Sequence, residues 1–208
     1  MVKSVSSSPV SHTDMSEDCF NIGHIEYGSE IYGPGKRTVI WFQGCTLGCR
    51  GCWNTQYQSN KPASLIPPSE LLEMILDHGN DVTFLGGEPL QQIDNLCWLV
   101  DELKHHGISI MLYTGYELEE IENDPQKREL CQKVDILIPG RYRDDLRDTN
   151  LLWRGSQNQP LIYLHDPQQT KDENQVEITI GPDGSVTCLG YPSEELIEHI
   201  NSLDQIKL

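Results

Sequence analysis

Residues 44–54 read Gly-Cys-Thr-Leu-Gly-Cys-Arg-Gly-Cys-Trp-Asn, and the rest of the chain is organised around them. The cysteines Cys45, Cys49 and Cys52 stand in a C-x3-C-x2-C spacing, which lets one loop point three sulfurs at one centre. A structural zinc site needs a fourth protein ligand, and no Cys or His lies close enough in sequence to supply it. Three thiolates on a cluster of four irons would leave one iron open to a ligand that is not protein.

The chain has 208 residues, enough for one domain with tails and a sizeable core. Its 32 acidic and 15 basic residues give a formal net charge of −17, which argues against non-specific binding to nucleic acid or to an anionic membrane surface. There is no apolar run of membrane-spanning length, and the serine-rich first residues lack the apolar core of a signal peptide. Seven cysteines, three of them clustered, favour metal ligation in a reducing compartment. We therefore expect a cytoplasmic protein.

The order of predicted elements indicates an α/β fold. Residues 1–17 lack apolar periodicity, so we expect a disordered leader there. Strands are predicted at residues 38–43, 81–85, 108–113, 134–138 and 161–164, and helices at residues 70–78, 93–106 and 116–122. This alternation predicts right-handed crossovers and a parallel sheet with the helices outside, either curved as a partial barrel or lying open.

The predicted core domain spans residues 18–165, and residues 166–208 form a C-terminal extension packed on it. The extension begins with a polar linker over residues 166–175. A hairpin is predicted around Pro182-Asp-Gly184, and a helix over residues 192–203.

The distribution of charge indicates that the cysteine loop binds an anionic group. Residues 31–69 contain no Asp or Glu, yet they carry Lys36, Arg37, Arg50 and Lys61, whose charge would stabilise thiolates and an anionic cluster.

The sequence Gly86-Gly-Glu-Pro89 ends a predicted strand. Its two glycines let the backbone approach a ligand closely, and its carbonyls with Glu88 would accept hydrogen bonds from a protonated amine. A plain strand-to-helix turn is the alternative reading of this motif.

Several motifs in order carry a family resemblance. They are Gly33-Pro-Gly-Lys-Arg37, the 44–54 loop, Thr83-Phe-Leu-Gly-Gly-Glu-Pro89, Tyr113-Thr-Gly-Tyr116 and Trp153-Arg-Gly-Ser-Gln-Asn-Gln159. Together they resemble the radical S-adenosylmethionine superfamily and, within it, the glycyl-radical enzyme activases that act on anaerobic ribonucleotide reductase. The resemblance covers about residues 20–164.

The resemblance implies a partial (β/α)6-type barrel and a 4Fe-4S cluster on Cys45, Cys49 and Cys52. The open iron would chelate S-adenosylmethionine, which is cleaved reductively to a 5′-deoxyadenosyl radical that takes hydrogen from a glycine of the reductase. No catalytic residue beyond the cluster ligands is implied. The implied cofactor contacts are Trp53, Asn54, Gly86, Gly87, Glu88, Pro89, Thr114 and Gly115. A low-potential donor such as flavodoxin or ferredoxin would supply the electron, and neither nucleic acid nor membrane is an expected partner.

Departures from the family pattern leave the substrate open. Gly51, before the third cysteine, agrees with the ribonucleotide reductase activators, but Pro139-Gly-Arg141 replaces the Asp-Gly-Pro expected after the late strand. The alternatives are a radical enzyme that modifies a small molecule or peptide, and an electron carrier or structural metal protein. An electron carrier or structural metal protein would give residues 86–89 no role.

The other cysteines are expected outside the cluster. Cys97 and Cys131 each have apolar neighbours of their own and are expected to be small core residues. Cys19 and Cys188 lack the spacing of a second cluster site. The arginines between Arg141 and Arg154 are expected in a solvated loop with local Arg–Asp pairs.

Overall fold

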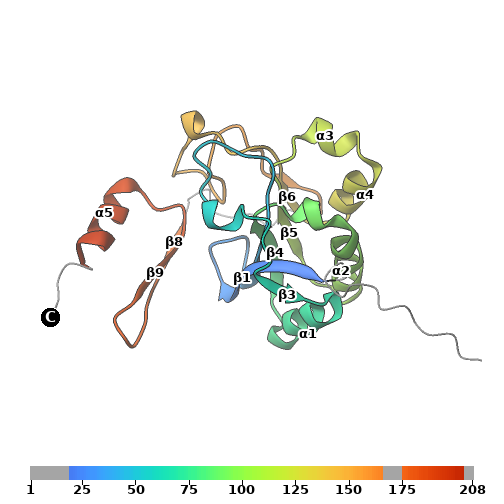
Figure 1. Cartoon of the computed structure of the whole chain (residues 1–208), viewed down its shortest axis with the longest axis horizontal. Coiled ribbons are helices and arrows are strands. Elements are labelled where there is room, and N and C mark those ends of the chain that lie inside the picture. Colours follow the sequence, from blue (N-terminus) through green and yellow to red (C-terminus); the bar gives the residue numbers. More distant parts are fainter. Residues whose placement is uncertain (1–18, 166–174, 204–208) are drawn as a thin grey trace, which may run out of the picture.

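The computed structural model describes residues 19–165 and 175–203, and Figure 1 follows the chain through its elements. The predicted leader, residues 1–17, and most of the predicted linker at 166–175 lie outside these ranges. Across the described part of the chain, no helix combines the length and apolar character needed to cross a membrane.

Four parallel strands form the centre of the sheet. In spatial order they are β2 (Arg37–Phe42), β4 (Asp81–Gly86), β5 (Ile110–Tyr113) and β6 (Ile136–Ile138). Their residues are almost continuously buried, as expected of strands covered on both faces. Because parallel strands leave a sheet at the same edge, the loops that follow them meet there. The predicted α/β class with a parallel sheet is thereby confirmed.

Antiparallel strands complete the sheet at both edges, in the order β3-β1-β2-β4-β5-β6-β7. β1 (Phe20–Ser29) pairs with β2 and with β3 (Ser64–Ile66), and β7 (Ile162–Tyr163) pairs with β6. The prediction of parallel strands therefore holds for the centre and not for the edges. The connection from β1 to β2 is too short for the helical crossover that a parallel pair requires.

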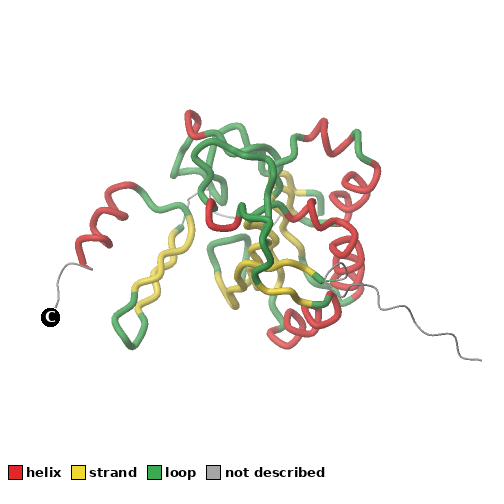
Figure 2. The backbone as a smooth tube through the Cα atoms, in the orientation of Figure 1, coloured by secondary structure: helices red, strands yellow, loops and turns green. Residues whose placement is uncertain are grey.

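The four helices of the core pack on one face of the sheet, at the right in Figure 2. They are α1 (Pro68–His78), α2 (Ile93–His105), α3 (Leu118–Glu122) and α4 (Pro125–Lys133). Their buried apolar side chains join alternate residues of the strands, such as Phe84 and Leu112, in one cluster. The sequence did not predict α4, because its only buried residues are Leu130 and Cys131 in an otherwise polar stretch. Short 3-10 turns are η1 (Thr55–Tyr57), η2 (Pro89–Gln92) and η3 (Asp144–Leu146).

Loops rather than helices cover the opposite face. Trp41 of β2 and Leu85 of β4 pack there with Tyr32, and Met111 of β5 packs with Trp153. Each strand thus sends alternate side chains to a helical layer and to a loop layer, as the two-residue period of a strand requires.

The C-terminal segment forms the predicted hairpin and helix, which lie at the left of Figure 1. The hairpin consists of β8 (Val176–Ile180) and β9 (Val186–Gly190), and the helix is α5 (Glu194–Leu203). Leu189 packs against the cluster that contains Tyr32 and Trp41, so the segment contacts the loop-covered face of the core.

Candidate active site

The cysteine loop begins where β2 ends and is closed by backbone hydrogen bonds. Gly44 N–H donates to the Tyr57 carbonyl at 2.8 Å, and Cys45 N–H donates to the Gln58 carbonyl at 3.1 Å. Gly44 has a φ of +105°, in the left-handed region that favours glycine. These contacts hold together the two ends of the loop that carries all three cysteines.

The loop after β4 lies directly against the cysteine loop. Gly87 N–H donates to the Phe42 carbonyl at 2.7 Å, and Glu88 N–H donates to the Gly44 carbonyl at 2.8 Å. A Cβ on Gly87 would lie 2.3 Å from the Gly44 carbonyl oxygen, and one on Gly86 would lie 2.6 Å from the Phe42 nitrogen. The two glycines are therefore required by the close approach of two backbones, whatever else they do.

Glu88 joins this loop to the one that follows β5. The residue is 1% exposed, and its carboxylate accepts hydrogen bonds from Thr114 Oγ1 at 2.8 Å and from Gly115 N–H at 2.8 Å. It also accepts from Leu90 N–H at 3.0 Å. Burial raises the pKa of Glu88 to about 7, and these three donors partly oppose that shift. The carboxylate therefore fixes Thr114 and Gly115 in place, a role that the sequence did not predict for it.

One pocket brings nearly all of the predicted site residues together beside the carboxyl ends of the parallel strands. Its empty space, including the part that is open to solvent, amounts to about 660 Å³. The predicted residues that line it are Cys45, Cys49, Cys52, Trp53, Asn54, Gly86, Gly87, Glu88, Thr114 and Gly115. Pro89 is the exception, because it is buried at the start of η2 and lies outside the lining. The predicted contact of Pro89 with the cofactor stays a prediction.

The pocket has seven further lining residues that the sequence did not single out as site residues. They are Leu47, Leu85, Tyr113, Gly140, Tyr142, Gln159 and Tyr191. Gln159 could have been found, since it ends a quoted motif, and its Nε2 donates to the Gly140 carbonyl at 3.0 Å. Tyr191 could not, because no spacing in the sequence relates the C-terminal segment to the cysteines.

Not all of the basic residues predicted around the cysteine loop lie beside the thiols. Arg50 does, since it stands between Cys49 and Cys52 and shares a surface pocket with Cys49 and Arg141. Arg37 begins β2, the six-residue strand whose other end leads to Cys45, and Lys36 lines a different pocket. The prediction that these two side chains stabilise the thiolates is wrong, because the length of the strand separates them from the site. Arg141 acts at Cys49 instead: burial raises the pKa of the Cys49 thiol, and the Arg141 charge opposes this.

The three cysteines that line the pocket are donors of the type that iron-sulfur clusters use. Among the described residues, no group of three or more His, Cys, Asp or Glu side chains is placed to hold a metal ion. In a 4Fe-4S cube each thiolate binds a different iron, so its ligands surround the cube without converging on one point. Burial raises the pKa of the Cys45 thiol, and ligation by iron would remove that proton.

The family of the chain follows from a comparison with family models. The model described as "4Fe-4S single cluster domain" matches residues 31–162, which include the three cysteines and the Gly86-Gly87-Glu88 turn. The chain belongs to this family. The 4Fe-4S domain agrees with the cluster predicted from the cysteine spacing.

Relatives named anaerobic ribonucleoside-triphosphate reductase-activating protein confirm the predicted resemblance and the prediction of an enzyme. The protein of Pasteurella multocida is 32% identical over 143 residues, covering 64% of this chain and 90% of the relative. That of enterobacteria phage T4 is 32% identical over 152 residues, covering 65% and 93%. That of Escherichia coli K12 is 28% identical over 144 residues, covering 64% and 92%. Among solved structures, QueE from Escherichia coli matches 50% of this chain and 58% of its own at 20% identity, with a TM-score of 0.39.

Proposed function

We propose that the chain is a radical S-adenosylmethionine enzyme that generates a glycyl radical on anaerobic ribonucleoside-triphosphate reductase. The observation that carries the proposal is the single pocket lined by the three thiols and by the Gly86-Gly87-Glu88 turn. The names of the relatives supply the target enzyme.

In this proposal the loop supplies three ligands and leaves one iron to the cofactor. Cys45, Cys49 and Cys52 would hold a 4Fe-4S cluster, and the iron without a protein ligand would be open to S-adenosylmethionine. When bound, the cluster supplies a low-potential electron to the sulfonium, whose carbon–sulfur bond breaks to give methionine and the 5′-deoxyadenosyl radical.

The chain itself binds and encloses the ligand. Gly86 and Gly87 line the pocket, where their backbone carbonyls would accept hydrogen bonds from an ammonium group. Glu88 holds Thr114 and Gly115 against the same pocket. The aromatic side chains in the lining exclude water, which protects a reactive radical from side reactions.

The finer features implied by the resemblance belong to the same proposal. They are the partial (β/α)6-type barrel, a low-potential electron donor of the flavodoxin or ferredoxin type, and a cytoplasmic location.

Anaerobic reconstitution with iron and sulfide, followed by reductant and S-adenosylmethionine, tests the chemistry. We expect 5′-deoxyadenosine from the wild type and from Cys97→Ala, since Cys97 packs against the apolar cluster. Cys52→Ala should lose both the brown cluster absorbance and the product. Equal loss in the two variants would remove the ligand assignment, and no product from the reconstituted wild type would overturn the proposal.

The target requires a second experiment. Incubation with an anaerobic ribonucleotide reductase should produce a glycyl radical signal in electron paramagnetic resonance. If the cofactor is cleaved but no protein partner gains that signal, the alternative holds, in which the enzyme modifies a small molecule or peptide directly. If the wild type binds a cluster but cleaves no cofactor, an electron carrier or structural metal protein remains.

A further inference from the structure

The C-terminal segment contributes a side chain to the candidate active site. Tyr191 follows β9 directly and lines the pocket that contains the three thiols. Its ring centroid lies 6.2 Å from that of Trp53, with the planes tilted by 43°. A Cβ on Gly155 would lie 3.0 Å from the Tyr191 ring, so the ring also packs closely against the 153–159 loop. Tyr191 is therefore in contact with the core on two sides.

Contacts on both sides of Tyr191 fix its position. The Gly190 N–H donates to the Tyr32 hydroxyl at 3.0 Å in a buried hydrogen bond, and Leu189 packs in the same region. On the other side, Arg147 Nη2 donates to the Pro192 carbonyl at 3.4 Å.

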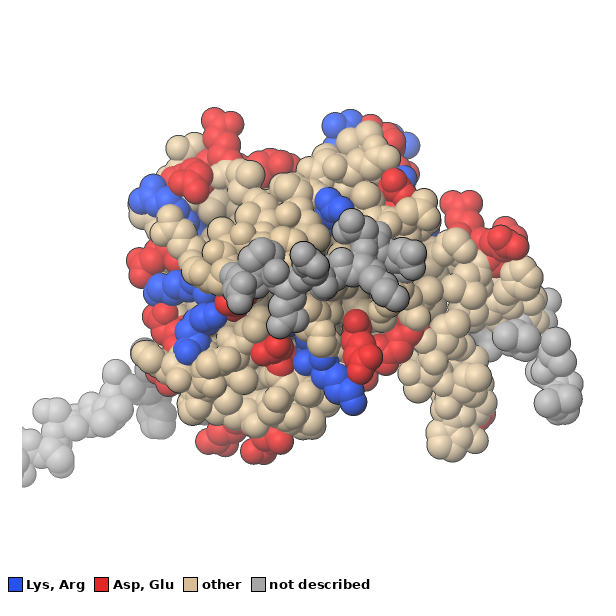
Figure 3. Space-filling view, turned by 180° about the vertical axis from the view of Figure 1, so that it is seen from behind, with Lys and Arg blue, Asp and Glu red and all other residues tan. Residues whose placement is uncertain are grey.

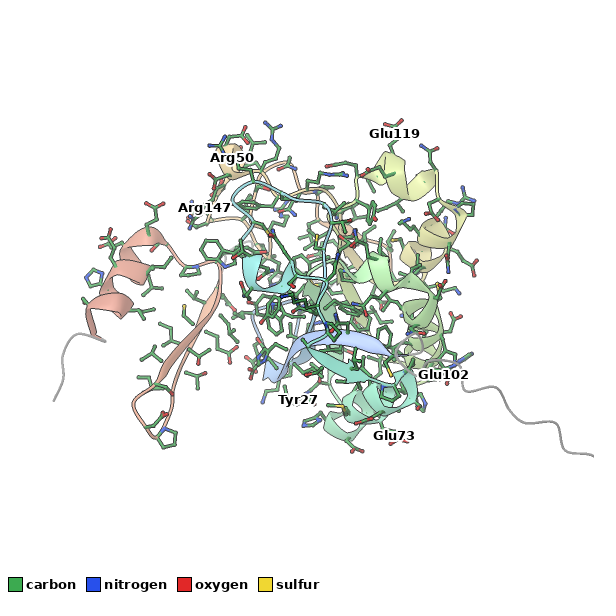
Figure 4. All side chains as sticks on the ribbon, viewed as in Figure 1. Tyr27, Arg50, Glu73, Glu102, Glu119 and Arg147 are labelled. Carbon is green, nitrogen blue, oxygen red and sulfur yellow. The ribbon has the colours of Figure 1, made fainter. Side chains whose placement is uncertain are left out.

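Arg147 connects this segment to the cysteine loop. Its guanidinium carbon lies 4.7 Å from the centroid of the Trp53 ring, a distance typical of cation–π contact. Its Nη1 also lies 3.7 Å from Glu194 Oε1, at the start of α5. Figure 4 shows Arg147 on the side of the core that faces the C-terminal segment. One arginine thus contacts both Trp53 and the segment that carries Tyr191.

Tyr191 comes from a part of the chain that the family model does not reach. That model ends at residue 162, and the Pasteurella multocida relative matches 64% of this chain while 90% of its own length is covered. The cysteines and the Gly86-Gly87-Glu88 turn thus lie within the part of the chain that the family model matches. Tyr191, which lines the same pocket, lies outside it.

We infer that Tyr191 is a ligand-contacting residue that completes the pocket of this chain. Its ring packs against Trp53, the residue next to Cys52, so it shields the Cys52 side from solvent and, with Trp53, receives a planar base of the bound ligand. An aromatic pair that borders a cavity offers flat apolar surface on which a nucleobase stacks. The assignment of the base as an adenine rests on the proposed function. The shielding of Cys52 is independent of that function, because it depends only on where the Tyr191 ring lies.

Thiol alkylation of the full-length, metal-free protein tests the shielding. Each cysteine is followed by peptide mass spectrometry under iodoacetamide, and the Cys52 rate is divided by the Cys97 rate within the same molecules. We expect Tyr191→Ala to raise this ratio roughly threefold to tenfold, because removal of the ring opens the pocket, and Tyr191→Phe to leave it within twofold. Tyr27→Ala is the matched control, since Tyr27 stacks on His78 and is not among the pocket residues (Figure 4).

The ratio separates local opening from general loosening, since loosening exposes both thiols. An unchanged ratio in Tyr191→Ala, or an equal rise in Tyr27→Ala, would overturn the inference.

S-adenosylmethionine binding to the reconstituted protein, measured by equilibrium dialysis, tests the stacking. Tyr191→Ala should weaken binding about threefold to tenfold and Tyr191→Phe by less than twofold. Unchanged affinity in Tyr191→Ala would overturn the contact with the base. If the wild type binds no S-adenosylmethionine while the alkylation ratio still rises, the proposed function fails and the shielding stands.

Discussion

Gly87 shows how a residue can be fixed by the backbone it touches. The sequence motif suggests a ligand-binding turn, but the nearest group to a Cβ at this position would be the Gly44 carbonyl, at 2.3 Å. The Glu88 N–H donates to that same carbonyl. Any side chain at Gly87 would therefore displace the start of the cysteine loop before it met a ligand.

Substitution of Gly87 tests this coupling. Gly87→Ala should reduce iron and sulfide loading and lower the free energy of unfolding by about 1–3 kcal/mol, the usual range for overpacking. Gly107→Ala is the control, since Gly107 has a φ of +72° with nothing within 4 Å of its Cβ position. Gly107→Ala should lower the free energy of unfolding by about 1 kcal/mol and leave iron and sulfide loading normal. Metal analysis and denaturant titration measure both quantities, and full loading of Gly87→Ala would contradict the coupling.

Glu88 gives the fold a pH dependence whose sign follows from its raised pKa. Between about pH 4.5 and pH 7 the folded protein keeps a proton on Glu88 that the unfolded chain has lost. This contribution to stability is complete below pH 4.5 and is lost as the pH rises through about 7, by at most about 3 kcal/mol.

Glu88→Gln should remove that slope from a plot of unfolding free energy against pH. Glu73→Gln, on the exposed surface of α1, should retain it (Figure 4). Denaturant titrations from pH 4.5 to pH 8 measure the slope. Identical slopes in the two variants would mean that Glu88 does not change its protonation in this pH range.

At the scale of single residues, the sequence predicts correctly which residues lie together when they are close along the chain. Cys45, Cys49 and Cys52 are close in sequence, and one closed loop brings them together. The prediction that Arg37 lies beside the thiols failed. Arg37 is near Cys45 in sequence, but it stands at the start of β2 and the cysteine loop follows the end of that strand. Sequence reasoning could not find Tyr191, which reaches the pocket only through the docking of a distant segment.

Among the elements, β2, β4 and β5 are held at their amino ends by one buried cation. Arg37 is fully buried, and its guanidinium donates to Thr83 Oγ1 at 2.7 Å, to the Val82 carbonyl at 2.6 Å and to the Ser109 carbonyl at 3.0 Å. Burial lowers the pKa of Arg37 to about 10, so it stays charged at neutral pH. A planar fork with several donors makes these contacts together, and a lysine cannot.

Replacement of this cation tests its role in strand alignment. Arg37→Lys should lower the free energy of unfolding by on the order of 3 kcal/mol, because it leaves buried acceptors unpaired. Arg128→Lys is the control, since Arg128 makes one exposed hydrogen bond to the Glu122 carbonyl. It should change stability by less than about 0.5 kcal/mol. Equal effects in urea titrations would show that the Arg37 fork contributes no more than a surface arginine.

The elements themselves were predictable where apolar periodicity is strong. The stripes of α1 and α2 and the apolar runs of β2 and β4 lie where the sequence predicts them. β3 and α4 were missed for a physical reason: β3 has three residues and is partly exposed, and α4 buries two side chains. Such elements are ordered by their neighbours rather than by their own pattern.

For the whole molecule, packing divides the chain into regions of unequal protection. The central strands are covered by helices on one face and by loops on the other, whereas the β8–β9 hairpin exposes apolar surface. Ile180 is 72% exposed and Ile178 is 46% exposed. In Figure 3, charged side chains of both signs are interspersed over the core, while the projecting hairpin is largely uncharged.

Hydrogen exchange should follow this division. A two-stranded ribbon outside a larger sheet has little stability of its own, so the amides of β8 and of β9 up to Leu189 should exchange at least tenfold faster than those of β4 and β5. Gly190 should be the slow exception, because its N–H donates to the buried Tyr32 hydroxyl. The β1–β2 pair is the control: it is also antiparallel but lies within the seven-stranded sheet, and it should exchange slowly. Mass spectrometry of deuterium uptake measures these rates. Equal protection of the hairpin and the β1–β2 pair would mean that another surface covers Ile178 and Ile180 in solution, and fast exchange at Gly190 would remove the contact that holds Tyr191 beside Trp53.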